Sequence, residues 1–393
     1  MIDKVSVAEC SLCGSCVSAC PTGAISYTKK HLGFSYPQID LKKCVDCGKC
    51  EQACPLLNCP EYKKPMNSYE AKHKQSEIRK QSSSGGVFSA LAQAVFECQG
   101  LVVGAAFQSD WSVKHICIES IEDLPELRGS KYVQSETRDC FLQIKKELES
   151  GRMVLFSGCP CQCAALNAFL GKGVAGKLFL VDFICHGMLS QTLFFEYLKD
   201  LEEKNKSKIK EFSFRDKTYG WIDSGPKVVF ENGREKCWPL YEDLYMQGYF
   251  QALCMKEACY SCIYKNFHSG SDLTLGDFWG GEVLDPEFYE KDGVSIVSIQ
   301  TEAGQSLLRK AEKNLILKDM GLEVLTKYNQ GLYKPFGPNA RREQYLRLAS
   351  EKGELDALKQ MTRLSTGEQI KRVYHTFHRK MRYYLKKRGK NGK

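Results

Sequence analysis

The sequence CSLCGSCVSACP occupies residues 10–21 of this 393-residue chain, and CVDCGKCEQACP occupies residues 44–55. Both segments follow the pattern C-x2-C-x2-C-x3-C-P, and each cysteine of the first segment has a counterpart 34 residues later, as residue 10 has at residue 44. A repeat this strict indicates two equivalent small sites built from one module. These two segments therefore decide the fold of the N-terminal region.

The cysteine spacing is that of bacterial two-cluster ferredoxins, in which four thiolates hold each [4Fe-4S] cubane. Three cysteines at three-residue steps surround one cluster, and the fourth cysteine of each repeat binds the other cluster. A zinc site would favour two distant CxxC pairs and a disulfide framework a secreted chain, so iron–sulfur clusters are the favoured interpretation. The predicted ligand sets are Cys10, Cys13, Cys16 and Cys54, and Cys44, Cys47, Cys50 and Cys20.

Length and composition predict that a larger globular domain follows this module. The module needs only about 60 residues, so roughly 280 residues remain for a core-bearing domain, and 43% of all residues are hydrophobic. No stretch approaches the ~20 apolar residues of a membrane span, and the N-terminus has no apolar signal core. Twenty cysteines beside cluster motifs favour a reducing, cytoplasmic location.

The positive charge is concentrated at the C-terminus. Residues 371–393 carry ten Lys or Arg and no acid, which leaves 46 basic against 47 acidic residues elsewhere. Apolar side chains recur there at helical spacing and predict a basic amphipathic helix for an anionic membrane surface or a partner; a helix packed on its own domain is the alternative. These side chains are Ile370, Val373, Tyr374, Phe377, Met381, Tyr384 and Leu385. The neutral body and the lack of a binding motif argue against nucleic acid.

Two polar segments in the second domain are candidates for binding a phosphorylated cofactor. Residues 81–86 read QSSSGG and precede a helix that starts at Val87, whose N-terminus suits a phosphate; an ordinary hydroxyl N-cap is the alternative. Residues 127–132 read LRGSKY, with two cations around a glycine and a tyrosine for ring stacking; a solvated loop is the alternative.

Further cysteines follow predicted strands. Strands over 153–156 and 178–184 end at SGCPCQC and Cys185, at the edge where parallel sheets place their sites. Far downstream, Cys259 and Cys262 form a CxxC pair, which is either a redox dithiol or half of a metal site. Because the chain already carries cluster motifs, a third iron–sulfur centre is favoured.

Other predictions concern local structure and single residues. A short hairpin is expected between the two cysteine segments, and buried strands are expected over 101–107 and 113–118. Arg215 and Lys217 could grip an anionic substrate, and a salt-bridge pair at a strand end is the alternative. Five cysteines outside the motifs are expected to be small apolar core residues: Cys98, Cys117, Cys140, Cys237 and Cys254.

Several of these segments, in the same order, resemble motifs of the family of coenzyme F420 hydrogenase/dehydrogenase beta subunits over roughly residues 70 to 340. They are residues 81–88, 128–132, 158–162, 185–187, 214–217 with 220–221, and 259–279. The resemblance implies an α/β flavoprotein that binds FAD, carries its own [4Fe-4S] cluster and exchanges a hydride with a deazaflavin. The cluster ligands that it implies are Cys161, Cys185, Cys259 and Cys262, with Cys159 and Cys163 leaving open which thiol of this group binds iron. The flavin contacts that it implies are Ser83, Ser84, Gly85, Gly86, Arg128, Lys131 and Tyr132.

The expected architecture has a two-cluster ferredoxin-like module (1–62), an α/β flavin and iron–sulfur domain (63–345) and a basic C-terminal helical tail (346–393). The expected function is an oxidoreductase that passes electrons between a hydride donor such as coenzyme F420 and a ferredoxin or other redox partner protein, through FAD and the clusters. Two alternatives stay open: a ferredoxin-fed reductase of a sugar or small metabolite in surface polysaccharide synthesis, and an electron-transfer or scaffold subunit without its own substrate. No catalytic residue is assigned from the sequence.

Overall fold

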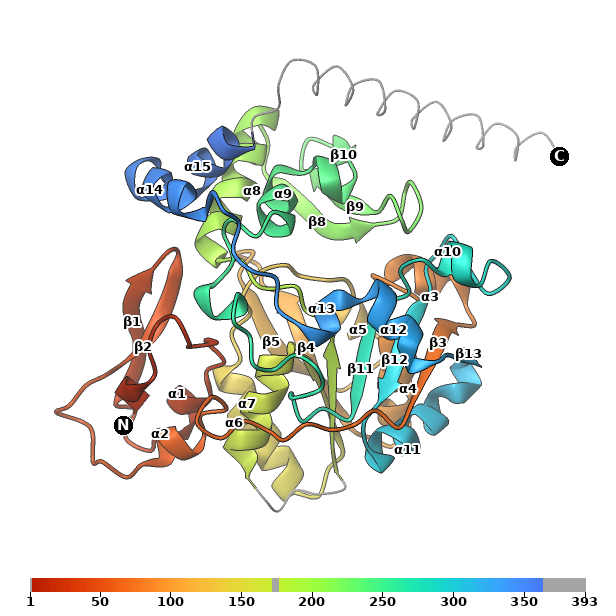
Figure 1. Cartoon of the computed structure of the whole chain (residues 1–393), viewed down its shortest axis with the longest axis horizontal. Helices are drawn as coiled ribbons and strands as arrows, with labels where there is room; N and C mark the ends of the chain where they lie inside the picture. Colours follow the sequence, from red (N-terminus) through yellow and green to blue (C-terminus); the bar gives the residue numbers. More distant parts are fainter. Residues whose placement is uncertain (1, 172–176, 363–393) are drawn as a thin grey trace.

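The computed structural model describes residues 2–171 and 177–362. It has a small N-terminal module, a large mixed sheet covered by helices, and a smaller three-stranded unit beside one end of that sheet (Figure 1). The predicted basic amphipathic helix over residues 370–385 lies outside the described residues. Within them, each helix is too short or too polar to cross a membrane.

The N-terminal module contains the hairpin predicted between the two cysteine segments. Strands β1 (Ile25–His31) and β2 (Phe34–Ile39) pair antiparallel, which confirms that prediction. Each cysteine segment begins a short helix directly after its glycine: α1 (Ser15–Ala19) and α2 (Lys49–Gln52). The two glycines, Gly14 and Gly48, have φ angles of 80° and 71°, a left-handed conformation that favours glycine.

An eight-stranded sheet forms the body of the second domain, in the order β13-β3-β12-β11-β7-β6-β4-β5. The four inner strands β4, β6, β7 and β11 run parallel, and their outer neighbours pair antiparallel. The four strands predicted here from the sequence are all present. The bounds are β3 Asn67–His73, β4 Leu101–Phe107, β5 Val113–Ile118, β6 Val154–Gly158, β7 Leu178–Phe183, β11 Leu273–Asp277, β12 Ser295–Ile299 and β13 Leu315–Asp319.

Helices cover both faces of this sheet (Figure 1). On one face α4 (Val87–Phe96) and α11 (Glu302–Ala311) bury Leu91 and Leu307, and on the other α6 (Arg138–Glu149) and α7 (Pro160–Leu170) bury Ile144 and Leu166. A sheet buried on both faces needs the near-continuous apolar strands that this sequence supplies. Shorter helices are α3 Ser76–Gln81, α5 Leu124–Leu127, α10 Gly281–Leu284, α12 Leu322–Tyr328 and α13 Gln330–Tyr333.

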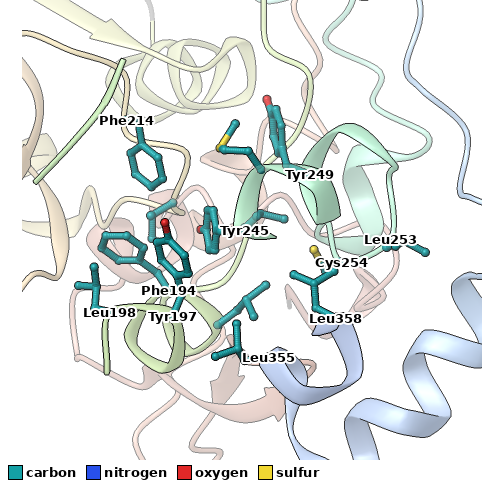
Figure 2. Close-up of a cluster of buried hydrophobic side chains, with 14 of the residues drawn as sticks. Phe194, Tyr197, Leu198, Phe214, Tyr245, Tyr249, Leu253, Cys254, Leu355 and Leu358 are labelled. Carbon is teal, nitrogen blue, oxygen red and sulfur yellow. The ribbon is translucent and has the colours of Figure 1, made fainter. Parts of the chain in front are cut away.

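The smaller unit consists of a three-stranded antiparallel sheet and four helices. An aromatic core holds it together, with Phe194, Tyr197 and Tyr245 packed in ring contacts at its centre (Figure 2). Leu355 and Leu358 belong to the same core, so the chain packs with this unit as far as the last described helix. The elements are α8 Gln191–Asn205, β8 Ile209–Asp216, β9 Gly225–Phe230, β10 Glu235–Cys237, α9 Leu244–Phe250, α14 Arg342–Lys352 and α15 Glu354–Met361.

Hydrogen bonds fix the N-terminal module to the second domain through its first cysteine segment. Thr137 Oγ1 donates to the Cys13 carbonyl at 2.6 Å, and Ser15 Oγ donates to the Ala165 carbonyl at 3.3 Å. At the tip of the hairpin, Thr192 Oγ1 donates to a backbone carbonyl at 3.1 Å. The first cysteine segment therefore lies at the interface between the two domains.

Candidate metal and cofactor sites

Four cysteines, contributed by both repeats, line a cavity at the inner side of the N-terminal module. The cavity has a volume of about 330 Å³, and its thiols are Cys10, Cys13, Cys16 and Cys54. This set is called the inner site, and residues 10–21, which supply three of its thiols, are called the inner repeat or inner segment. Burial raises the pKa of Cys13 to about 12 and also raises the pKa values of Cys10 and Cys54. Thiolates in such a place need a cationic partner, and bound iron would supply one.

The other four cysteines line a second, smaller cavity of about 20 Å³ near the surface: Cys20, Cys44, Cys47 and Cys50. This set is called the outer site, and residues 44–55, which supply three of its thiols, are called the outer repeat or outer segment. Burial alone would raise the pKa of Cys20, but hydrogen bonds around Thr22 and Ala24 lower it, and the Ala24 N–H donates to its sulfur at 3.2 Å. The structure thus brings together the same two sets of four thiols that the spacing predicts. Their binding of iron stays a prediction for each residue.

Two buried tyrosine hydroxyls lie near the inner thiols, Tyr36 near Cys10 and Tyr264 near Cys13. Among the described residues, no three Cys, His, Asp or Glu side chains lie close enough to hold a single metal ion. The hydroxyls of Tyr36 and Tyr264 are buried and find no hydrogen-bond partner within the described ranges. Burial raises the pKa of Tyr264, and the nearby thiols of Cys13 and Cys161 raise it further. Hydroxyl donors left in this position suit the sulfides of a cluster.

A third group of thiols lies beside the carboxyl ends of the neighbouring parallel strands β6 and β7. Its members are Cys159, Cys161, Cys185, Cys259 and Cys262. Hydrogen bonds from the Cys159 thiol lower the pKa of Cys161 and lower that of Cys185 to about 6. Burial raises the pKa of Cys259 to about 11, and the charges of Cys185 and Cys161 contribute to this rise. Burial likewise raises the pKa of Cys262 to about 12, with Cys161 the next cause. The structure therefore brings together all four cysteines that the family resemblance implies.

The structure separates the three closely spaced cysteines that the sequence left unresolved. Helix α7 starts at Pro160, directly after Cys159, so Cys161 and Cys163 lie in its first turns. Cys163 is fully buried in the apolar core with Phe156, and its sulfur lies 3.8 Å from a backbone carbonyl. Cys159 precedes the helix and lies beside Cys161. Cys163 is thus a core residue, while the other two face the third thiol group.

A cavity of about 260 Å³ adjoins this third group. Cys159 and Cys185 line it, together with six of the seven predicted flavin contacts. These six are Ser83, Ser84, Gly86, Arg128, Lys131 and Tyr132. The seventh, Gly85, lies outside the lining: its N–H donates to Ser295 Oγ at 2.8 Å, and a Cβ there would approach the Ala71 carbonyl oxygen to 2.6 Å. Gly85 therefore serves close packing of the backbone.

The two predicted cofactor segments meet at the cavity. Ser83 Oγ accepts hydrogen bonds from the Ser130 N–H at 2.7 Å and the Ser130 hydroxyl at 2.8 Å. Helix α4 begins after Gly86, whose φ of 85° favours glycine, and no side chain caps the helix. The alternative of an ordinary hydroxyl N-cap is therefore wrong: Ser83 bonds the neighbouring loop, while Ser82 and Ser84 donate to the backbone carbonyls of Ile78 and Val294.

Two arginines and a lysine line the cavity, and the lysine ammonium donates to the backbone carbonyls of Glu126 and Arg128. Arg215 Nη1 lies 3.1 Å from Asp277 Oδ2 and 3.3 Å from the Tyr132 hydroxyl. Burial by itself would lower the pKa of Arg215, but Asp277 raises it above the ordinary value, so this cation stays charged. Burial lowers the pKa of Lys131 to about 7. Arg128 is half-buried and donates to two side chains near the cavity. The cavity thus combines positive charge with aromatic walls, a pattern that suits an anionic ring-bearing ligand.

Lys217, which the sequence paired with Arg215 as an anion-gripping residue, has a structural role. Its ammonium donates to three backbone carbonyls at 2.6 to 2.7 Å, and it does not line the cavity. Burial lowers its pKa to about 7, with Arg215 as the second cause. Of the two residues, Arg215 lines the cavity, where it pairs with Asp277, and a grip on an anion stays a prediction for it.

One hydrogen-bond network that lines the cavity was not predicted from the sequence. His115 lies in β5. Its Nε2 donates to the Ser157 carbonyl at 3.1 Å, its Nδ1 accepts from the Ser135 hydroxyl at 3.0 Å, and its ring stacks on Phe156. Gln162 donates to Ser135 Oγ at 2.9 Å. Burial lowers the pKa of His115 to about 4, so the ring is neutral near pH 7. A lone histidine in an apolar strand gave only a weak signal, because its partners lie far away in the sequence.

Comparison with known proteins agrees with this geometry. Residues 9–57 match a 4Fe-4S dicluster domain. Residues 68–140 match the N-terminal part, and residues 151–321 the C-terminal part, of the family described as "Coenzyme F420 hydrogenase/dehydrogenase, beta subunit". A curated relative is one of the subunits of F(420)H(2) dehydrogenase from Methanosarcina mazei, 24% identical over 184 residues. That match covers 44% of this chain and about half, 51%, of the relative.

A chain of the F420-reducing [NiFe] hydrogenase complex from Methanosarcina barkeri, solved in a xenon derivatization study, is also similar. The likeness covers 76% of this chain and 92% of that chain, with 20% sequence identity and a TM-score of 0.46.

The fold and the domain matches define an oxidoreductase-type protein: a mixed α/β chain with a large sheet and an N-terminal 4Fe-4S dicluster module. The two beta-subunit matches together span more than half of the sequence, and the chain belongs to the family of coenzyme F420 hydrogenase/dehydrogenase beta subunits.

Proposed function

We propose that this chain is a flavin- and cluster-containing electron-transfer protein that exchanges a hydride with coenzyme F420 or a similar donor and passes electrons to a partner protein. One observation carries this proposal: the cavity and the third thiol group share Cys159 and Cys185. A ligand in the cavity would therefore lie against a cluster site. The direction of electron flow is left open by this arrangement.

The thiol groups form a sequence that leads away from the cavity. The charge of Cys161 acts on Cys10 and Cys13, and that of Cys50 acts on Cys16, so neighbouring groups are close. When bound, a flavin accepts two electrons as a hydride and releases them singly, whereas a cubane cluster carries one electron at a time. The order cavity, third group, inner repeat and outer repeat suits such a conversion.

The residues of the chain would bind and orient the cofactor. The enclosed volume of about 260 Å³ is close to the lower end of small-molecule sites, roughly 300–1,000 Å³, so it suits the flavin ring system, and the rest of an FAD would extend beyond the enclosed part. Tyr132 offers an aromatic face, and Arg128 and Arg215 offer positive charge for a phosphorylated chain or an anionic ring. The neutral His115 network closes the polar wall beneath Cys159.

The wider parts of the proposal rest on the family. Its units are residues 1–62 for electron transfer, 63–345 for the cofactors and 346–393 as the C-terminal part, whose described residues up to Met361 pack on the smaller unit. A redox partner protein or ferredoxin would receive or supply electrons, because the relatives' names place them in hydrogenases and dehydrogenases. A cytoplasmic location, with peripheral membrane contact through the basic tail, completes the proposal.

Iron, acid-labile sulfide and flavin, measured on protein purified without oxygen, test the proposal. About twelve iron and one FAD per chain are expected, at about four iron for each set of four thiolates. Reduced F420 should then bleach the flavin and cluster bands; flavin without bleaching would favour the ferredoxin-fed reductase. About eight iron without flavin would overturn the proposal and leave an electron-transfer or scaffold subunit.

A matched pair of arginine variants sharpens the flavin assignment. Arg128→Ala removes a cavity-lining cation and is expected to weaken FAD binding about tenfold or more, the loss of one charge-assisted contact. Arg152→Ala is the control, because Arg152 pairs with Glu119 and Glu147 away from the cavity. Equal FAD affinity in both variants would place the flavin elsewhere.

A further inference from the structure

Lys256 is a buried lysine at the junction of two thiol groups. Its side chain is almost fully enclosed, with 1% of the residue exposed. Its ammonium donates to Gln134 Oε1 at 2.6 Å and to the backbone carbonyl of Ser11. Ser11 lies between the first two cysteines of the inner repeat, so the lysine reaches from the second domain into the loop around the inner cavity.

The ammonium lacks an anionic partner of the usual kind. In the part of the chain that the structure describes, no carboxylate pairs with Lys256 within 4 Å. Burial alone would lower its pKa, but the charges of Cys259 and Cys161 raise it above the ordinary value. Tyr36, whose hydroxyl has no hydrogen-bond partner in the described ranges, lies in the same electrostatic environment. The thiols around this lysine therefore lie on both sides of the interface: Cys259 and Cys161 in the second domain, and Cys10, on whose pKa Lys256 acts, in the N-terminal module.

A buried charge of this kind is costly unless a counter-charge is present. Three other enclosed lysines have different partners. Lys72 pairs with Glu290 at 3.3 Å, and Lys217, which is less buried, donates to backbone carbonyls. Lys265 donates to the carbonyls of Cys185 and Gly331, so among the described residues it contacts the third thiol group but not the inner loop. Lys256 differs because it touches one cysteine loop directly and is enclosed by the charges of another thiol group. Its location therefore points to the two cluster sites and not to packing alone.

We propose that Lys256 is a positioning residue that holds the inner cysteine loop and whose charge favours the reduced state at both the inner and the third iron–sulfur sites. Each one-electron reduction of a cluster adds one negative charge, and a fixed positive charge nearby makes that addition more favourable. The inner site rests on the dicluster match, whereas the third site rests on the proposed function. The outer repeat, whose Cys47 is exposed, serves as an internal reference.

The test is a redox titration with dithionite, followed by electron paramagnetic resonance, on full-length protein purified without oxygen. Lys256→Met keeps the length of the side chain and removes the charge. It is expected to lower the midpoint potentials of the inner and third clusters, with a tenfold smaller equilibrium constant for reduction, which is about 59 mV for one electron. Lys256→Arg keeps the charge and is expected to keep both potentials. Lys72→Met removes a buried lysine elsewhere and should shift none of them.

Two further measurements keep the test decisive. The iron content per chain shows whether Lys256→Met protein still assembles its clusters. If it does not, Gln134→Glu is used instead. This variant keeps Lys256 but gives its ammonium a carboxylate partner, and it is expected to lower the potentials of the inner and third clusters in the same way. Signals are assigned with Cys47→Ser protein, which should lack the outer cluster. Unchanged inner and third potentials in Lys256→Met with full iron, or an equal shift of all three clusters, would overturn the proposal. If wild-type protein holds only eight iron, the proposed third site fails, and the inner cluster still tests the role of Lys256.

Discussion

The two cysteine segments have the same pattern but opposite surroundings. In the inner segment, Cys13 is 9% exposed, and the loop is hydrogen-bonded to the second domain through Thr137 and Ser15. In the outer segment, the neighbouring apolar side chains Leu41 and Val45 are 70% and 64% exposed. The comparison shows that cysteine spacing determines the local loop, while the residues between the cysteines determine where the loop lies.

The inner segment has residues that suit an interface at its variable positions. Ser15 is fully buried and bonds two backbone carbonyls, one in its own module and one in the second domain. Its counterpart 34 residues later is Lys49, an exposed cation that could not be buried there without a partner. If the proposed function holds, the inner segment faces the cofactor domain and the outer segment faces a protein partner.

The largest expected contrast comes from equivalent ligand positions. Cys13→Ser and Cys47→Ser should each lose about four iron, because each removes one ligand of one cubane. Cys13→Ser should also lower the melting temperature by on the order of 10 °C, since losing the inner cluster leaves an unfilled cavity at the domain interface. Cys47→Ser should lower it by only a few degrees. Iron analysis and thermal melts followed by circular dichroism measure both effects.

Equal melting temperatures in these two variants would contradict the inner and outer assignment. A control without clusters is needed, because the Ser substitution itself places a hydroxyl in a buried site. Comparing both variants after iron removal with a chelator supplies it: the difference between them should shrink once neither protein holds a cluster.

A middle-sized contrast is expected at the two equivalent glycines. Gly14→Ala and Gly48→Ala share a left-handed backbone, which costs roughly 1–2 kcal/mol in each. A Cβ on Gly14 would also lie 2.8 Å from Thr137 Oγ1, whereas one on Gly48 would meet no atom within 4 Å. Overcrowding should add about 1–3 kcal/mol for Gly14 alone. Urea denaturation midpoints of the two variants measure the difference.

A double-mutant cycle identifies the origin of that difference. In a Thr137→Ala background the close contact at Gly14 disappears, so Gly14→Ala should cost about as much as Gly48→Ala. If the extra cost persisted without the Thr137 hydroxyl, the two glycines would differ for a reason other than the interface contact.

The sequence predicted the parts of this molecule that depend on local pattern. The cysteine sets, the hairpin between them and the strands that end at Cys159 and Cys185 all follow from spacing or periodicity, and the structure has the hairpin and these strands. The role of Cys163 was not predictable, because a shift in the start of α7 decides which side chains face the core.

Other features depended on contacts between distant segments, which no local pattern encodes. Gly85 looked like part of a phosphate-binding turn, yet it packs against the backbone of Ala71 and Ser295. Cys98 was expected in the core with four other cysteines, but it is exposed after α4. Lys256 had no signal beyond its position three residues before Cys259, because its partners Gln134 and Ser11 are over one hundred residues away.

The smallest expected effect concerns an exposed ion pair in the outer segment. Lys4 Nζ lies 2.8 Å from Glu51 Oε1, and the two side chains are 68% and 28% exposed. The equivalent position in the inner segment is Val17, which packs on an apolar cluster. Glu51→Gln should therefore lower the urea midpoint slightly at 0.05 M salt and not measurably at 1 M, where charges are screened within about 3 Å. Val17→Ala should cost the same at both salt concentrations, because burial of apolar surface does not depend on charge screening. A salt-independent effect of Glu51→Gln would show that the outer segment is held by packing as the inner segment is, and the contrast between the two repeats would then rest on exposure alone.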